Sequence, residues 1–269
     1  MQTPYMIHGK RIHNSEADYV RSELLIPKEI MVARTAKPEF FIEEQKLMRA
    51  EYPVDNQRKI FVRDLDEMKT ATCLRMFDSN GDLAGHIAVS KTGEIISLLK
   101  KYGAKVSHFM DHAFANAILI GGNSLDCFDC DSLGPNYCQR GFIPICKIKF
   151  SHYVDKYNMA SVYGEPDIIF YFYCGDPVGQ FWNKVQNREY LELDRYPAFT
   201  TLPYVDEIQE RIGVPTDDMD YEFAHNFRNM VWGLWNAKLK EEFWYRPHKL
   251  VEYILSDDER LMNWMRDYV

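Results

Sequence analysis

The stretch from Gly121 to Phe142 constrains the fold more than any other part of the sequence. It contains a glycine turn, a short apolar strand at Ser124–Phe128, a polar break and a short helix that ends at Gly141. A glycine after the last helical residue lets the chain turn through a left-handed conformation without a Cβ clash. An apolar run over residues 142–150 follows, and Pro144 near its start favours an edge or bulged strand. The stretch therefore predicts strand, short helix, strand.

A predicted meander and a helix precede this stretch. The candidate strands are Ala71–Phe77, Ala84–Val89 and Glu94–Leu99. Asn80-Gly81, between the first two, is a strong hairpin signal. A helix over His108–Ile120 follows, with Ser107 as its expected N-cap. We therefore expect three antiparallel strands in succession and then a helix.

The remaining pattern predicts helices at both ends of the chain and two further strands. Residues 1–36 are compatible with strands or with an arm packed on the main body. The predicted elements are a helix at Glu39–Glu51 after Pro38, strands at Ile60–Val62 and Asp167–Cys174, and helices at Asp206–Ile212, Asp218–Trp244 and after a capping box at Ser256–Glu259.

The composition limits the classes of partner. The chain has 269 residues, 46% of them hydrophobic, and a formal net charge of -8, which disfavours a broad grip on nucleic acid or on an anionic membrane. The sequence contains no run approaching the roughly 20 apolar residues of a membrane-spanning helix. Its N-terminus lacks the apolar core of a signal peptide, so we expect a cytoplasmic protein.

Four of the six cysteines have a spacing that raises the question of a metal site. Cys127, Cys130, Cys138 and Cys146 include one Cys-x-x-Cys pair, but the second pair typical of zinc sites is missing. We expect reduced, largely buried thiols and no metal. A zinc-stabilised binding module is the alternative.

At this point the sequence resembles a known family. The pattern Leu-Asp-x-Phe at residues 125–128, followed by Tyr-x-x-x-Gly-Phe at residues 137–142, resembles the second half of the GNAT (N-acetyltransferase) superfamily. Within that superfamily the pattern more closely resembles the divergent GNAT-like domains found in phage and mobile-element proteins. The order of elements predicted along residues 60–175 is also that of a GNAT core. The resemblance implies an α/β (α+β) fold with a mixed, mostly antiparallel central sheet flanked by helices.

The same resemblance implies a division of the chain into three parts. We predict an N-terminal arm and helix at residues 1–55, a GNAT-like core at 56–175 and a helical C-terminal extension at 176–269. The aromatic residues of that extension are either core or a surface for a protein partner.

The resemblance further implies a site for acetyl-CoA. In this family the cofactor lies between two splayed strands, here Glu94–Leu99 and Leu125–Phe128, and helix N-terminal N–H groups hold its pyrophosphate. The loop Lys100–Ser107 would be the phosphate cradle, although only Gly103 matches the family pattern clearly and Lys105 stands where a small residue belongs. The implied cofactor-binding residues are Ile96, Ser97, Leu98, Lys100, Gly103, Ala104, Lys105, Ser107 and Phe128.

Two residues are the expected catalytic groups. Tyr137 corresponds to the family's general acid, because a phenol matches a departing thiolate, and Glu94 lies where many members place a base. Each could instead be an ordinary core or strand-end residue. Other candidates for the base are Asp126, Asp129, His86, His108 and His112.

Two functions follow from the resemblance. The first is an N-acyltransferase that moves an acetyl group from acetyl-CoA to an amine of an unknown small-molecule or protein substrate. The second is a catalytically silent GNAT-like scaffold, of the kind a phage encodes, that acts through its C-terminal helices by binding another protein. The degenerate phosphate loop and the long extension favour the second function.

Overall fold

The computed structural model describes residues 6–7, 10–11, 31–129, 133–138, 140–153, 155, 158–174, 202–215, 220–243 and 248–266. The chain divides into two compact units, Met1–Asn123 and Ser124–Val269. A two-stranded pair, β1 (Met6–Ile7) and β2 (Lys10–Arg11), lies at the start of the first unit. The expectations for Cys130, for Trp244 and for most of residues 1–30 and 175–201 lie outside the described residues.

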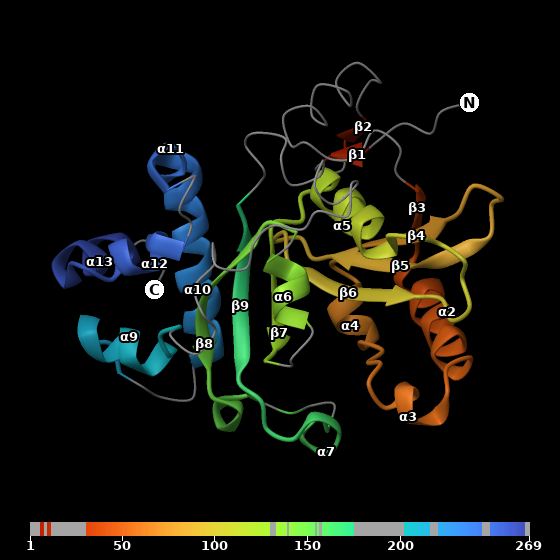
Figure 1. Ribbon diagram of the computed structural model, residues 1–269, viewed down its shortest axis with the longest axis horizontal. Coiled ribbons are helices and arrows are strands. Elements are labelled where there is room, and N and C mark those ends of the chain that lie inside the picture. The colour runs from red at the N-terminus through yellow and green to blue at the C-terminus, as the bar shows by residue number, and fades with distance from the viewer. Residues whose placement is uncertain are drawn as a thin grey trace. The chain divides into compact units, whose positions relative to one another are not determined.

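The first unit is built on a four-stranded antiparallel sheet (Figure 1). Its strands, in spatial order, are β3 (Val32–Ala36), β4 (Thr72–Phe77), β5 (Leu83–Val89) and β6 (Ile95–Lys100). The predicted meander β4-β5-β6 is confirmed, and Gly81 turns between β4 and β5 with a φ of 85°. The N-terminal segment adds β3 as a fourth strand, paired with β4.

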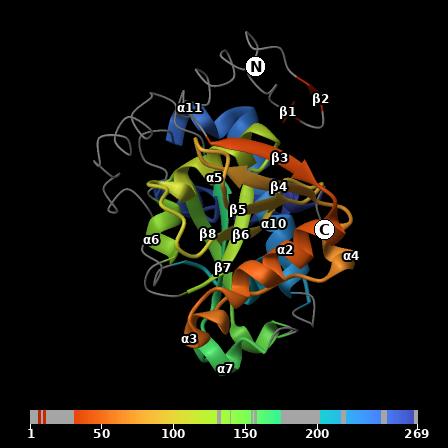
Figure 2. The same cartoon turned by 90° about the vertical axis from the view of Figure 1, so that its right-hand side faces the viewer.

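Helices cover both faces of this sheet (Figure 2). The helices of this unit are α2 (Pro38–Ala50), α3 (Val54–Gln57), α4 (Leu65–Met68) and α5 (Phe109–Leu119), of which α2 and α5 pack on opposite faces. The Phe41 ring of α2 stacks on His86 of β5 at 4.5 Å. Neighbouring Gly85 faces the other way, because a Cβ there would lie 2.3 Å from Cζ of Phe109 in α5. The central strand β5 is therefore buried on both sides.

Two local expectations for the first unit are wrong. Residues Ile60–Val62 form no strand, because the segment pairs with no other strand and Val62 packs instead on the apolar cluster around Phe41. Ser107 is not the N-cap of α5. His108 occupies that position with a φ of 55° and no capping hydrogen bond from its side chain.

The second unit contains a three-stranded antiparallel sheet (Figure 1). It consists of β7 (Ser124–Phe128), β8 (Phe142–Ile148) and β9 (Ile168–Tyr173), and β9 lies between the other two. The expectation for Pro144 is confirmed, since β8 is an outer strand of this sheet and its register shifts between Pro144 and Cys146. The predicted fold class, antiparallel sheets flanked by helices in a mixed α/β protein, is confirmed.

Helices of the second unit cover both faces of its sheet. They are α6 (Leu133–Cys138), the 3-10 helix η1 (Phe150–His152), α7 (Ala160–Tyr163), α9 (Val205–Ile212), α10 (Asp220–Leu234), the π-helix η4 (Trp235–Leu239), α11 (Lys240–Phe243), α12 (His248–Ile254) and α13 (Asp258–Met265). Tyr137 of α6 contacts Tyr171, whereas Trp235, just after α10, contacts Phe172. Since Tyr171 and Phe172 alternate along β9, α6 and α10 lie on opposite faces.

The aromatic residues of the C-terminal helices are divided between core and surface. Trp235 is 2% exposed and donates its Nε1–H to the carbonyl of Cys174 at 3.0 Å, whereas Trp232 is 37% exposed. The capping box predicted at Ser256 is wrong in its residue. Asp257 caps α13 by accepting a hydrogen bond from the backbone N–H of Arg260.

Across the described part of the chain, no helix has both the length and the apolar character required for a membrane crossing.

Candidate functional site

The sequence-predicted site residues belong to both units. Glu94 and the residues from Ile96 to Ser107 lie in the first unit, whereas Phe128 and Tyr137 lie in the second. Each group is held by a local set of contacts within its own unit.

Strand β6 carries a bulge at Ile96. Val89 pairs with Ile95 and Ala88 with Ser97, so Ile96 is the extra residue. Its carbonyl accepts a hydrogen bond from Nε of Arg63 at 2.6 Å. The hydroxyl of Ser97 accepts one from Nε2 of Gln45 at 2.8 Å, and Gln45 is buried. Polar groups of β6 are thus engaged by side chains from α2 and from the segment before α4.

Lys100, the first residue of the predicted phosphate loop Lys100–Ser107, forms a hydrogen bond across that loop. The Nζ of Lys100 donates to the carbonyl of Val106 at 3.0 Å, across the loop. The carbonyl of Lys100 accepts from the hydroxyl of Tyr52, which follows α2. Gly103 has a φ of 72° and open space around its Cβ position, so glycine is favoured there by backbone conformation and not by crowding. Ala104 donates its N–H back to Lys101 at 3.2 Å.

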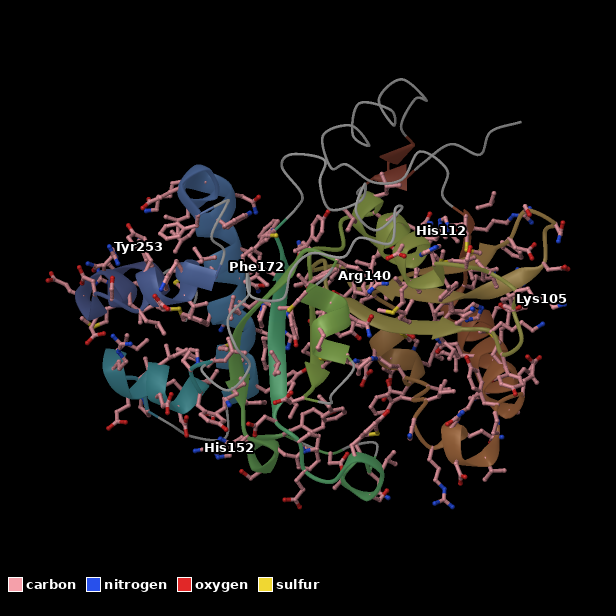
Figure 3. All side chains as sticks on the ribbon, viewed as in Figure 1. Lys105, His112, Arg140, His152, Phe172 and Tyr253 are labelled. Carbon is pink, nitrogen blue, oxygen red and sulfur yellow. The ribbon has the colours of Figure 1, made fainter. Side chains whose placement is uncertain are left out.

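The end of this loop offers donors to an anion. Within the described part of the chain, the backbone N–H groups of Lys105, Ser107 and Phe109 donate no hydrogen bond. Lys105 is exposed in the same loop (Figure 3). However, Asp111 in the first turn of α5 is buried and its carboxylate lies 3.3 Å from Nδ1 of His108. The donors fit a pyrophosphate, and the charge of Asp111 opposes it.

Glu94 lies directly before β6 and is 9% exposed. Its backbone N–H donates to the hydroxyl of Ser90 at 3.1 Å, and its carbonyl accepts from the N–H of Ser90 at 2.8 Å. These bonds fix the turn that delivers the chain into β6. Leu98 is half-buried and pairs with Ile87 of β5. The role of Glu94 as a base stays a prediction.

The histidines that are alternative candidates for the base lie in different surroundings. His86 is fully buried and bonds through Nε2 to a carboxylate oxygen of Glu44 at 2.6 Å, and Glu44 also accepts two hydrogen bonds from Arg75. Burial lowers the pKa of His86, and the contact with Glu44 opposes this only in part. Burial also lowers the pKa of His112, one turn after His108 on α5 (Figure 3). His86 thus belongs to an ionic network that links α2 to the sheet.

In the second unit Tyr137 lies among aromatic rings. It is half-buried and meets Phe142 and Tyr171 edge-on, with ring centroids 6.4 and 5.7 Å apart. Burial raises the pKa of Tyr171 well above its usual range, and the hydroxyl of Tyr171 lies 3.8 Å from Sγ of Cys127. The role of Tyr137 as an acid stays a prediction.

Phe128 and the two aspartates of its strand are also engaged. The Phe128 ring stacks on Tyr163 at 5.9 Å and meets Tyr153 edge-on at 5.7 Å. Asp126 accepts a hydrogen bond from the hydroxyl of Tyr221 at 3.0 Å. Asp129 is exposed and its N–H bonds to the carbonyl of Asp167. The contacts of Phe128 and Asp126 are with aromatic residues far away in the sequence.

Three of the cysteines expected to be reduced, largely buried thiols lie in the described part of the chain: Cys127, Cys138 and Cys146. Burial raises the pKa of Cys138 and of Cys146, while Cys127 is half-buried. In the described ranges, no group of three or more His, Cys, Asp or Glu side chains is arranged to hold a metal ion. Cys130, the other member of the series, lies outside those ranges.

Sequence reasoning missed a groove in the first unit. It has a volume of about 680 Å³ and lies between α2 and residues 62–65. Ile42, Val62 and Leu65 supply apolar lining, and Arg63, which bonds to Ile96, is part of its wall. No sequence signal identifies it, because its two walls are separated along the chain.

Comparison with known proteins finds similarity among solved structures. No protein-family model matches the chain, and no curated protein matches it. Among solved structures, a GCN5-related N-acetyltransferase from Rhodopseudomonas palustris is similar at 14% identity and a TM-score of 0.32, over 55% of this chain and 98% of that one. A proposed phosphinothricin N-acetyltransferase is similar at 13% identity and a TM-score of 0.32, over 53% of this chain and 97% of that one.

Proposed function

We propose that this chain is a GNAT-like N-acyltransferase that moves an acetyl group from acetyl-CoA to an amine. The observation that carries the proposal is the end of the Lys100–Ser107 loop, where backbone N–H donors and the exposed Lys105 precede the 11-residue helix α5. A helix N-terminus with unpaired donors attracts a pyrophosphate, because its dipole adds partial positive charge to those donors.

The chemistry would be a direct transfer. The amine nitrogen attacks the thioester carbon, a C–N bond forms and the C–S bond breaks. Glu94, or a water molecule, takes the proton from the amine, and Tyr137 gives a proton to the departing thiolate. No covalent enzyme intermediate is needed.

A catalytically silent scaffold is the second candidate, and two observations favour it. The buried Asp111 adds negative charge where a pyrophosphate would bind, and Arg63 engages the carbonyl of Ile96 on β6. Such a protein would act by binding another protein, for which exposed Trp232 and Met262 of the C-terminal helices are candidate contacts.

Isothermal titration with acetyl-CoA separates the two functions. We expect micromolar binding that Lys105→Glu weakens by about ten- to a hundredfold, because the substitution replaces an attractive charge with a repulsive one. Lys91→Glu makes the same charge change at an exposed turn of the same unit and serves as the matched control. Tyr137→Phe should keep the affinity and lower kcat.

Absence of heat at millimolar acetyl-CoA, for a protein that is folded by circular dichroism, would eliminate the acyltransferase proposal. Asp111→Asn gives an independent check on the phosphate site. Removal of its negative charge should tighten acetyl-CoA binding, and an unchanged affinity would place the pyrophosphate elsewhere.

A further inference from the structure

The strand β3 has one edge that is not covered by another described strand. It pairs with β4 on one side, and in the described ranges no strand lies on its other side (Figure 2). Within the same ranges, the backbone groups of residues 32–36 form no hydrogen bonds other than those to β4. An outer strand presents half of its backbone N–H and C=O groups away from its neighbour. The outer edge of β3 can therefore pair with a further strand.

Side chains on one face of β3 and β4 form an array of arginines and aromatic rings. Arg34, at the centre of β3, pairs in register with Arg75 on β4. Both guanidinium groups lie over the ring of Phe77, at 4.7 Å for Arg34 and 5.0 Å for Arg75. Arg75 also lies 4.9 Å from the ring of Phe40, which is 52% exposed, and Val32 is 41% exposed. A guanidinium stacked on a ring keeps its in-plane N–H donors available to a partner.

The positive charge of this array is only partly balanced. Both carboxylate oxygens of Glu44 accept hydrogen bonds from Arg75, and one of them also bonds to His86. Arg34 and Lys37 are exposed, and neither forms an ion pair within the described part of the chain. Two like charges directly opposite each other on neighbouring strands repel. A carboxylate placed beside Arg34 offsets this repulsion, so the edge is complementary to an acidic partner.

The position of Arg34 also restricts which strand can pair with β3. It is the third of the five residues of the strand. A symmetric antiparallel pairing of two copies of β3, centred on this residue, would place Arg34 directly opposite its own copy. A partner strand with glutamate or aspartate at that position gains an ion pair instead. The charge of the edge therefore disfavours a second copy of this chain and favours an acidic strand.

We propose that the outer edge of β3 binds an extended acidic segment of another protein, which joins the four-stranded sheet as a fifth strand. The segment pairs with residues 32–36 over about 17 Å, at about 3.3 Å per residue. Its acidic residue lies opposite Arg34. The residue two positions away is on the same face and lies opposite Val32, so an apolar side chain is favoured there. The recognised pattern is apolar, any residue, acidic.

Fluorescence anisotropy with a labelled, end-blocked heptapeptide tests this proposal. The probe has the sequence threonine-valine-threonine-glutamate-threonine-valine-threonine, which places valine, glutamate and valine on one face of a strand. Arg34→Glu should weaken binding by at least about tenfold, because a repulsive charge replaces a charge-assisted hydrogen bond. Arg58→Glu is the matched control. It makes the same charge change at an exposed residue after α3 and should leave the affinity unchanged.

Two altered peptides separate strand pairing from simple charge attraction. A peptide with lysine in place of glutamate should bind at least about tenfold more weakly. A peptide with every backbone nitrogen methylated should not bind, because it has no N–H to donate to β3. Hydrogen exchange should show that the unmodified peptide protects the amides of residues 32–36.

Four results would each overturn the proposal. They are no binding of the unmodified peptide at millimolar concentration, equal binding of either altered peptide, protection of the same amides by formation of a dimer of this chain, and tighter binding of a single-stranded oligonucleotide than of the peptide. The titration contains no acetyl-CoA and reports on residues of β3 and not on the loop Lys100–Ser107. Its outcome is therefore independent of the acyltransferase proposal.

Discussion

The sheets of the two units are attached to their main helices by different chemistry. In the first unit, Glu44 of α2 bonds to Arg75 on β4 and to the fully buried His86 on β5, with both Arg75 contacts at 2.7 Å. In the second unit, Phe170 and Phe172 of β9 meet Tyr221 and Trp235 of the helical layer through ring contacts of 5.4 and 5.7 Å. One attachment is ionic and directional, and the other is aromatic.

The two attachments contribute different things. The ionic one sets the orientation of the helix on its sheet, and the aromatic one contributes more of the free energy of unfolding. The ion pair of Glu44 with Arg75 is only partly buried and adds little net free energy, but it is satisfied only in one geometry, so it fixes how α2 lies on the strands. Aromatic contacts gain more from the area they bury and depend less on the exact angle. We therefore expect the second unit to lose most from truncation, and the first unit to be sensitive to changes of charge.

The largest expected effect is that of Phe172→Ala. This side chain is fully buried and contacts Trp235, so its truncation leaves a cavity and should cost about 3–5 kcal/mol of unfolding free energy. Urea unfolding measures the loss, and hydrogen exchange assigns it to the second unit. Trp232→Ala, at an exposed aromatic residue of α10, should change the free energy by no more than about 0.5 kcal/mol. A smaller cost for Phe172→Ala than for loss of Glu44 would reverse the comparison.

An effect on the order of 3 kcal/mol is expected from His225, whose ring meets Phe170 on the aromatic face. Its Nδ1 lies 2.8 Å from Nη2 of Arg228, and burial followed by the Arg228 charge lowers the pKa of His225 to about 4. The unfolded chain takes up this proton near pH 6.5 and the folded chain does not. Stability from this group is therefore complete above pH 6.5 and is lost as the pH falls toward 4.

Unfolding at a series of pH values measures this contribution. His225→Gln, which cannot titrate, should flatten the stability curve between pH 6.5 and 4. An identical curve for the variant and the wild type would show that the ring is solvated in the folded state. His86→Gln should act in the same direction in the first unit, since burial lowers the pKa of His86 also.

Glu44→Gln tests the ionic attachment of the first unit. Burial alone would raise the pKa of Glu44, but hydrogen bonds from Arg75 and His86 outweigh it and lower the pKa. The variant should lose about 1–3 kcal/mol near neutral pH, because Arg75 and His86 keep only a neutral partner. The difference from wild type should shrink as the pH falls below the ordinary value of 4.5. Glu43→Gln, on an exposed pair with Lys46, should have almost no effect.

Many strands and helices follow from the local sequence pattern. The predictions that are wrong concern segments whose structure depends on packing against residues far away in the sequence. The bounds of Ser124–Phe128 are those predicted, because an apolar run between turn residues has few other conformations. Ile60–Val62 looks equally strand-like, but the partly buried Val62 packs on an apolar cluster that joins α2, α4 and the sheet, and the segment pairs with no strand. The sequence does not decide between a strand and an arm at Val32–Ala36, since the partner strand β4 lies about 40 positions later.

The sequence predicts where the segments of the candidate site lie along the chain, but it does not predict which side chains bond to one another there. The position of the loop around Gly103 before a helix follows from sequence order. The bond from Gln45 to Ser97 joins residues 52 positions apart, and that from Arg63 to Ile96 joins residues 33 apart. A single sequence contains no signal for such pairs, because the donor and acceptor types occur at many other positions. For the same reason, the sequence does not predict the contacts of Glu44 with Arg75 and His86.

The smallest expected losses of unfolding free energy come from helix caps, and they should be equal in the two units. The units differ in how their helices attach to the sheets, and not in how their helices are capped. Asp64 caps α4 in the first unit by accepting from the N–H of Glu67 at 3.1 Å, and Asp257 caps α13 in the second by accepting from Arg260 at 2.9 Å. Each change to Ala should cost about 1 kcal/mol, measured by urea unfolding. Ser256→Ala is the control for the misplaced cap and should cost a few tenths, about 0.3 kcal/mol. If Asp64→Ala costs several-fold more than Asp257→Ala, polar contacts in the first unit carry more of its stability than the Glu44 network alone accounts for.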